Sequence, residues 1–533
     1  MTAMPLTLLR GGHVYSPADP FATAMLVDGP TVAWVGSDGA ADVHVDSADE
    51  TIDLDGALVT PAFVDAHVHA TSTGLALTGL DLTDARSLAE CLARVESFAR
   101  ARRGAVVLGH GWDETTWPER RPPTRQELDR ASYGGVVYLT RIDVHSAVVS
   151  SALLATVPEV RSETGYSDSG HLTTDAHHVV RRVARESVTP AQRRAAQQAT
   201  RRRAAELGIG AFHELAGPDI SSEDDLRSIL ALAAEEPGPS VVGYWGELDG
   251  IDRARELGTL GAAGDLFADG AIGSHTAWLR TVYADAGHAG HGYLTAAQVR
   301  DHMIACTDAG LQAGFHAIGD AALEAVVAGF REAAGRVGAA AVRARRHRIE
   351  HVEMVDAPMI GVLADLGVVA SVQPVFDELW GGETGMYAER LGAERAGRLN
   401  PFADMASAGV ALALGSDAPV TPLGPWAAVR AAAFHTNSSQ RLSVRAAFSA
   451  HTRGGWRAAG RDDVGVLAPG APATYAVWDS GDLVVQAPDE RVSAWSTDPR
   501  SGVPGLPDLT PDGRPLPSCL RTVVAGAAIH AVE

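Results

Sequence analysis

The sequence contains no lysine, and all 44 of its basic residues are arginines. This absence excludes Schiff-base catalysis by a lysine side chain, and it excludes a carboxylated lysine as a bridge between two metal ions. Acidic residues number 66, which gives a formal net charge of −22. Because a strongly negative chain repels nucleic acids and anionic membranes, we expect neither as a partner.

Cysteines and long apolar runs are also scarce. Cys91, Cys306 and Cys519 lie far apart and form no CxxC pair, which argues against a disulfide framework or a thiolate zinc site. The first residues lack the apolar core and cleavage site of a secretory signal, and no apolar run approaches the ~20 residues that span a bilayer. We therefore expect a cytoplasmic protein that acts on a small molecule, and the sequence leaves homo-oligomer formation open.

The two ends of the chain share a pattern of short β-type runs separated by Gly, Asp and Pro. This pattern covers residues 5–58 and returns in residues 464–533, and it is typical of small β-sheets. The chain has 533 residues, more than one compact domain usually holds. We predict that residues 1–58 and 460–533 form one composite β-sandwich beside a larger domain.

The middle of the chain alternates short apolar strands with Ala-, Arg- and Glu-rich helical stretches, as parallel βα units do. The candidate strands are Ala57–Val64, Gly210–Leu215, Val241–Trp245, Asp265–Ala268, Leu311–Ala317, Arg348–Val352, Val368–Gln373 and Val410–Gly415. Their number predicts an α/β fold with a (β/α)8 TIM barrel over residues 59–459. An excess of about a hundred residues after the first strand predicts an inserted cap subdomain over about 72–195.

The motif FVDAHVHA, residues 63–70, is the clearest local signal for a metal. Alternate residues of a strand share a face, so His67 and His69 can point together into a barrel mouth. Two imidazoles on one rigid strand form half of a site for Zn²⁺. Two histidines at this spacing also occur by chance, so the motif alone does not establish a metal site.

Three more polar residues end candidate strands: His316 in GFHAIGD, His351 in HRIEHVE and Asp417 in ALGSDAPV. Each taken singly reads as an ordinary polar residue, but the strand ends of a barrel converge on one face. Several imidazoles and a carboxylate on that face predict a site for a divalent transition metal. We expect zinc, with manganese and iron as alternatives, and one or two ions per chain.

Several motifs in order resemble one known family. LVTPAFVDAHVH resembles the opening of the amidohydrolase superfamily, and LFADGAIGS, HAIGD, RIEH, ASVQP and LGSDAPV resemble its branch called amidohydrolase family 3. N-substituted formamide deformylases belong to that branch. The similarity runs from about residue 5 to residue 530. It implies a (β/α)8 barrel, a composite β-sandwich and a metal-activated water that hydrolyses a C–N bond.

The resemblance also implies roles for individual residues. It places metal ligands at the ends of the first, fifth, sixth and eighth strands, namely His67, His69, His316, His351 and Asp417. Asp417 would act as general base toward the attacking water. His145, from the insert, would touch the substrate, and it or His351 would steady the oxyanion.

One position departs from the family pattern. Family members often carry a lysine just before LFADG, carboxylated to bridge two metals, and this chain has Asp265 there. With a single methylene, Asp265 should stop short of two ions unless the backbone or a metal moves. It is a candidate ligand that bridges through a shifted metal or binds one ion only, and a purely structural role is the alternative. We therefore expect one tightly bound ion, held by His67, His69, Asp417 and His316, with a carboxylate-bridged pair of ions as the alternative.

Three functions remain open at this point. The first is hydrolysis of an amide, formamide or cyclic C–N bond, the second is a deaminase with one metal, and the third is a catalytically silent barrel with a regulatory role. The complete ligand set argues against the third. Glu214 is expected beside the metal site as a hydrogen-bonded carboxylate, and the aromatic residues near the mouth are expected to line the substrate pocket or pack the cap: Trp112, Trp117, Trp380 and Trp426.

Overall fold

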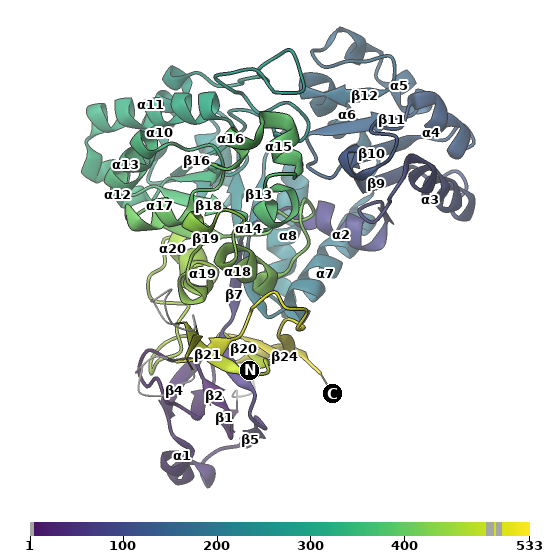
Figure 1. Ribbon diagram of the computed structural model, residues 1–533. Coiled ribbons are helices and arrows are strands. Elements are labelled where there is room, and N and C mark those ends of the chain that lie inside the picture. Colours follow the sequence, from purple (N-terminus) through teal and green to yellow (C-terminus); the bar gives the residue numbers. More distant parts are fainter. Residues whose placement is uncertain (1–4, 487–494, 497–503, 533) are drawn as a thin grey trace.

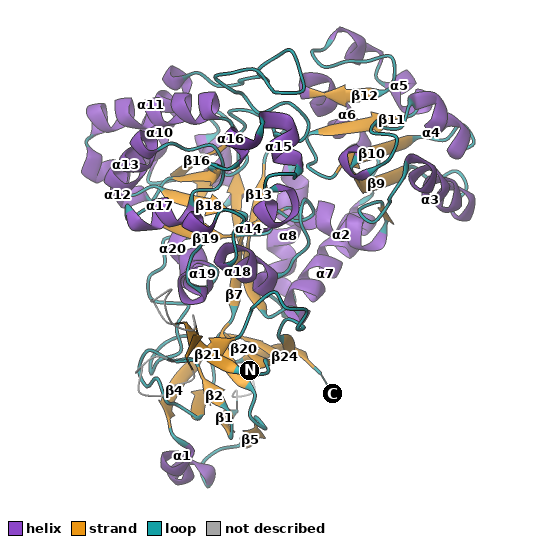
Figure 2. Ribbon diagram, in the orientation of Figure 1, coloured by secondary structure: helices purple, strands orange, loops and turns teal. Residues whose placement is uncertain are grey.

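The computed structural model describes residues 5–486, 495–496 and 504–532. Figures 1 and 2 show a β-rich base that holds both chain ends, a central body of strands surrounded by helices, and an outlying lobe with its own sheet. No helix in the described part of the chain is both long and apolar enough to cross a membrane.

The central body is built on parallel strands in two sheets, of order β14-β13-β7 and β15-β16-β17-β18-β19. Their bounds are β7 Phe63–Val68, β13 Ile209–Ala216, β14 Ser240–Trp245, β15 Gly261–Ala262, β16 Gln312–Ala317, β17 Arg348–His351, β18 Val369–Val372 and β19 Ala411–Leu414. The two sheets adjoin at both edges. Val68 forms a parallel bridge with Ala418, and the Leu260 amide donates to the Gly243 carbonyl. The predicted α/β fold is confirmed, and a closed barrel stays a prediction.

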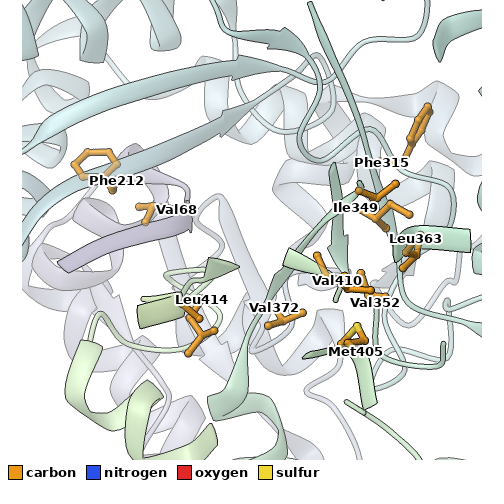
Figure 3. Packing of buried hydrophobic residues seen from close by; sticks show 14 of the residues in the cluster. Val68, Phe212, Phe315, Ile349, Val352, Leu363, Val372, Met405, Val410 and Leu414 are labelled. Atoms are coloured by element: carbon orange, nitrogen blue, oxygen red, sulfur yellow. The ribbon is translucent and has the colours of Figure 1, made fainter. Parts of the chain in front are cut away.

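Burial on both faces explains the composition of these strands. Every residue of β13 is buried, as expected for a parallel strand that is covered on both sides and reads as an almost continuous apolar run. Figure 3 shows labelled members of the shared core: Val68, Phe212, Phe315, Ile349, Val352, Leu363, Val372, Met405, Val410 and Leu414. The core therefore fixes where each strand ends, and the polar residues at those ends face one region.

Helices follow the central strands along the chain. They are α8 Glu223–Glu235, α9 Ile251–Leu257, α10 Ala296–Ala309, α11 Asp320–Val337, α12 Ala339–Arg345, α13 Ala357–Leu366, α14 Pro374–Trp380, α15 Met386–Leu391, α16 Ala393–Ala396, α17 Phe402–Ser407, α18 Pro425–Ala433, α19 Val444–Ala450 and α20 Arg453–Ala458. Helix α10 illustrates how the sequence sets such bounds. Thr295 and Gln298 form a capping box at its start, and Gly310 ends it with φ of 78°, a conformation that glycine adopts at little cost.

Two expected strands differ from the structure. The expected strand Ala57–Val64 spans two elements, because β6 (Leu58–Pro61) belongs to the base and β7 begins at Phe63. The expected strand Asp265–Ala268 is also wrong, since β15 is Gly261–Ala262 and the chain bends after it. In both places the apolar run continues through buried residues, so hydrophobicity alone does not mark the boundary.

Among the described residues, the base has two larger sheets, and the C-terminal segment adds a small sheet of order β22-β21-β23, with β21 Leu483–Gln486, β22 Trp495–Ser496 and β23 Leu506–Pro507. The other elements of the base are β1 Leu6–Arg10, β2 His13–Val14, β3 Ala24–Asp28, β4 Thr31–Gly36, α1 Asp38–Val45, β5 Glu50–Asp53, β6, β20 Tyr475–Asp479, β24 Ser518–Val524 and β25 Ala527–Ala531. One of the larger sheets has the order β4-β3-β1-β5, and the other, β2-β6-β20-β24-β25, combines strands from both ends of the chain. Leu9, Val59 and Tyr475 lie in one shared core. The domain boundaries at residues 58 and 460 stay a prediction.

The outlying lobe lies between β7 and β13 in sequence. Its elements are β8 Leu80–Asp81, α3 Leu88–Ala101, β9 Val107–Trp112, α4 Arg125–Ala131, β10 Val137–Arg141, β11 Ser146–Val149, α5 Ser151–Thr156, β12 His171–Thr173 and α6 Thr174–Glu186. The flanking helices α2 Ala70–Thr78 and α7 Pro190–Glu206 pack against each other beside the central body. Strands β12-β11-β10-β9-β8 form one sheet with separate hydrophobic clusters of its own. Helix α7 then leads into β13, as the sequence predicts.

Candidate metal centre

His67 and His69 stand at the end of β7 with their rings together. His67 is fully buried and His69 is 6% exposed, and their ring centroids are 5.2 Å apart. The Nε2 atom of each ring faces the same two carboxylates. For His67 the distances to Asp265 Oδ2 and Asp417 Oδ1 are both 3.3 Å, and for His69 they are 3.1 and 3.2 Å.

Asp265 lies between two pairs of histidines. Its Oδ2 faces His67 and His69, while its Oδ1 lies 3.5 Å from His316 Nδ1 and 3.7 Å from His351 Nε2. Asp265 therefore reaches both pairs of histidines, and whether it binds one ion or two stays a prediction. Gly264, directly before it, has φ of 104°, a conformation that glycine adopts at little cost.

The arrangement leaves polar atoms buried and unpaired in one place. Within the described residues, four side-chain atoms at the centre have no hydrogen-bond partner: His67 Nε2, Asp265 Oδ1, His316 Nδ1 and Asp417 Oδ1. A buried unpaired polar atom costs about 1–3 kcal/mol, so four together indicate that a ligand satisfies them. Imidazole nitrogens with carboxylate oxygens suit Zn²⁺, Mn²⁺ or Fe²⁺. Two sets of donor atoms lie within 4.8 Å of one another: His67, Asp265 and His351, and His67, His69 and Asp417. The residues present therefore fit a divalent metal.

The second nitrogen of each imidazole is bonded to the protein. The pairs are His67 Nδ1 to Glu350 Oε2 at 3.0 Å, His69 Nδ1 to the Leu215 carbonyl at 3.0 Å, His351 Nδ1 to Gln373 Oε1 at 2.8 Å and His316 Nε2 to the Gly270 carbonyl at 3.3 Å. Such bonds fix the ring orientation and the tautomer of metal-binding histidines. Sequence analysis missed Glu350 and Gln373, although both lie inside motifs that it used, RIEH and ASVQP.

Glu350 is a permanent anion beneath His67. It is fully buried and accepts from Arg348 Nε at 2.5 Å and from Arg348 Nη2 at 2.9 Å. Burial by itself would raise the pKa of Glu350, but the charge of Arg348 and the hydrogen bond from His67 hold it at about 2. Glu350 therefore stays ionised at neutral pH and favours the His67 tautomer that carries its proton on Nδ1.

Two residues of the centre have left-handed backbone conformations. The φ angle is 70° at His351 and 55° at Asp417. For a residue with a side chain this region costs roughly 1–2 kcal/mol, and such residues concentrate at functional sites. The Asp417 amide donates to the His67 carbonyl at 2.9 Å. This bond ties the eighth strand end to the first and keeps the Asp417 carboxylate beside both histidines.

The insert contributes His145 to the same cavity. The ring of His145 lies 5.1 Å from that of His316, and His145 lines the cavity together with His351 and Asp417. Burial, together with the nearby His316 and Arg181, keeps the pKa of His145 well below its usual range. His145 is therefore a neutral imidazole next to the candidate ligands.

Other residues singled out in the sequence lie around the centre. Glu214 Oε2 accepts from the Ala70 amide at 2.8 Å, and burial raises the pKa of Glu214 to about 8. It belongs to neither donor set in the described residues. Trp380 lines the cavity, whereas Trp112 and Trp117 pack in the lobe and Trp426 packs in the central core.

Two cavities adjoin the metal centre and share part of their lining. One cavity is apolar and aromatic, with Phe376, Trp380, Met386 and Tyr387. The other cavity runs beneath the outlying lobe, with Ser72, Val144, Arg181 and Arg185. His145, His316, His351 and Asp417 line both cavities. A molecule that reached from one cavity into the other would therefore contact the candidate ligands.

Residues 50–530 match the model of a family described as amidohydrolases. The chain belongs to the amidohydrolase family. The match covers the strands that carry every candidate ligand, so the resemblance seen in the sequence motifs is confirmed.

Individual proteins are also similar to the chain. Protein LONG AFTER FAR-RED 3 of Arabidopsis thaliana is 26% identical over 89% of this chain and 88% of its own length. The putative amidohydrolase YtcJ of Bacillus subtilis is 25% identical over 74% of this chain and 76% of its own length. The crystal structure of an uncharacterized metal-dependent hydrolase from Pyrococcus horikoshii has a TM-score of 0.71 and 26% identity, covering 89% of this chain and 97% of that one.

Proposed function

We propose that this amidohydrolase is a metal-dependent hydrolase that cleaves an amide, formamide or cyclic C–N bond of a small molecule. We further propose that its eight central strands close into a (β/α)8 barrel, with the candidate metal centre at their carboxyl ends. The observation that carries the proposal is the set of buried, unpaired donor atoms on His67, Asp265, His316 and Asp417.

The proposed metal ligands divide into two groups around Asp265. His67, His69 and Asp417 form the first group, and His316 and His351 face the other oxygen of Asp265. A bound divalent ion supplies Lewis acidity, which acidifies water and polarises a carbonyl group. The position of Asp265 supports a shared carboxylate in place of the lysine that the chain lacks.

Asp417 and His145 have complementary roles in this proposal. Asp417 turns its Oδ1 toward the metal-binding histidines, and its carboxylate can also accept a proton from the attacking water and pass it to the departing nitrogen. His145 is neutral at pH 7 because burial depresses its pKa, so it can donate a hydrogen bond to the developing oxyanion. The aromatic cavity keeps bulk water away from the reacting atoms.

Metal titration tests the centre. We expect metal-depleted protein to take up Zn²⁺, Mn²⁺ or Fe²⁺, and Asp265→Ala to weaken every ion that binds there. A break at one equivalent would show a single ion, and a break at two would show a pair that shares Asp265. Bicarbonate should not change the titration, because no lysine can be carboxylated. Uptake of less than half an equivalent would contradict the metal site.

Amine release tests the reaction. The metal-loaded protein is incubated with formamides, acetamides and cyclic amides, and the released amine is measured, with Asp417→Asn as the inactive reference. Release by the wild type alone supports the proposal. No release from any compound by protein of full metal content would contradict the hydrolase.

A further inference from the structure

Two arginines of the outlying lobe line the metal-site cavity without a carboxylate partner. Arg181 and Arg185 lie four residues apart on α6, on one face of the helix, and both line the cavity together with His69 and Asp417. Arg181 is 3% exposed. Within the described residues, the side-chain contacts of both arginines go to uncharged oxygens and to one imidazole.

The two arginines are held differently. Arg181 donates to the carbonyls of Val144 and Asp219 and approaches His177 Nδ1 at 3.2 Å. Arg185 has one polar contact, a long bond of 3.4 Å to Ser72 Oγ. Arg181 is thus a fixed charge, whereas the guanidinium of Arg185 keeps most of its donors free. Arg182 lies between them in the sequence and has the usual environment of an arginine. It is exposed and pairs with the Asp219 carboxylate at 3.0 Å.

The two guanidinium groups make this side of the cavity positive, a setting that favours an anionic ligand. Burial and the nearby charge of Arg181 lower the pKa of Arg185 to about 10, yet Arg185 remains charged at neutral pH. Asp225 and Glu214 lie near enough to oppose this shift, but among the described residues no carboxylate bonds to the guanidinium of Arg185. The guanidinium group presents a fork of donors that matches a carboxylate, and proteins use it for that purpose.

Resting on the proposed function, we propose that the substrate carries a carboxylate that Arg185 and Arg181 bind beneath the lobe. An apolar group would fill the adjoining aromatic cavity, against Phe376 and Trp380. The scissile C–N bond would then lie over the candidate ligands that line both cavities. The substrate class is an N-acylated amino acid or a similar amide with one anionic end and one apolar end.

Binding to metal-loaded protein tests the inference without turnover. The probes are 3-phenylpropionate and its neutral match 3-phenylpropionamide, and calorimetry gives the two affinities. We expect the carboxylate to bind roughly 10- to 100-fold more tightly, in the range of a hydrogen bond to a charged group. Arg185→Gln should abolish the preference and Arg185→Lys should restore part of it. Arg203→Gln, at an exposed pair with Glu206 on α7, should leave it unchanged.

Equal affinity for the two probes in the wild type would overturn the inference, as would a preference that Arg185→Gln leaves intact. Hydrolysis of N-formylphenylalanine and of N-formylphenylalaninamide separates the inference from the proposed function. Equal cleavage of both compounds overturns the carboxylate site and leaves the hydrolase standing. Cleavage of neither compound, with binding that depends on Arg185, leaves the carboxylate site standing and counts against the hydrolase.

Discussion

Replacing Glu350 by glutamine removes one negative charge next to His67 and leaves the shape of the side chain almost unchanged. The carboxylate bonds His67 Nδ1 at 3.0 Å and pairs with the fully buried Arg348. The Glu350→Gln variant leaves Arg348 without a counter-charge and weakens the bond that orients His67. The change should therefore affect both folding stability and metal affinity.

The size of the stability effect follows from the pKa of Glu350. Arg348 and His67 outweigh burial and hold this pKa at about 2, below the ordinary 4.5. At about 1.4 kcal/mol per pH unit, this depression corresponds to about 3 kcal/mol. Because the folded pKa is lowered, the stabilisation is complete above pH 4.5 and is lost as the pH falls toward 2. The stability difference between wild type and variant should therefore shrink over that range.

Two measurements on Glu350→Gln check this reasoning. Thermal unfolding at neutral pH should start at lower temperature than in the wild type, and competition with a chelator should show metal affinity reduced about 10- to 100-fold, as for other residues that orient metal-binding histidines. Glu324→Gln, at an exposed pair with Arg280, serves as the control and should change stability by less than about 1 kcal/mol. Wild-type metal affinity and unfolding in Glu350→Gln would refute the assigned role.

Three further substitutions probe the centre. Asp417→Asn should lower turnover by roughly 10²-fold or more while retaining more metal than His67→Ala, and near-normal turnover would mean that the general base is another group. His145→Ala should impair catalysis at unchanged metal content, and metal loss measured by elemental analysis would make His145 a ligand. Gly264→Ala places a methyl group 2.6 Å from Leu215 Cδ1 at a φ of 104°, so it should lower metal affinity by displacing Asp265, and a titration identical to the wild type would contradict that.

Local sequence patterns predicted the candidate metal ligands better than the residues that contact them. His67 and His69 could be paired because strand alternation is a local rule, and His316, His351 and Asp417 because parallel strands end on one face. The partners of those histidines depend on which side chains meet across the core. Gln373 lies on the strand end next to His351 and bonds its Nδ1, a contact between residues 22 positions apart. Arg185 comes from the inserted lobe, and no short sequence motif indicates that this lobe lies beside the metal centre.

Asp265 has one methylene, yet its carboxylate lies beside both pairs of histidines. The argument that Asp265 stops short assumed a regular strand up to that residue, whereas β15 ends at Ala262. Gly264, with φ of 104°, follows the strand and directly precedes Asp265, whose carboxylate lies between both pairs of histidines. The short side chain of Asp265 has few rotamers, and its carboxylate is charged without the chemical modification that a lysine would need. The anion between the two groups of histidines is thus an intrinsic part of the fold, and its position depends on the glycine that precedes it.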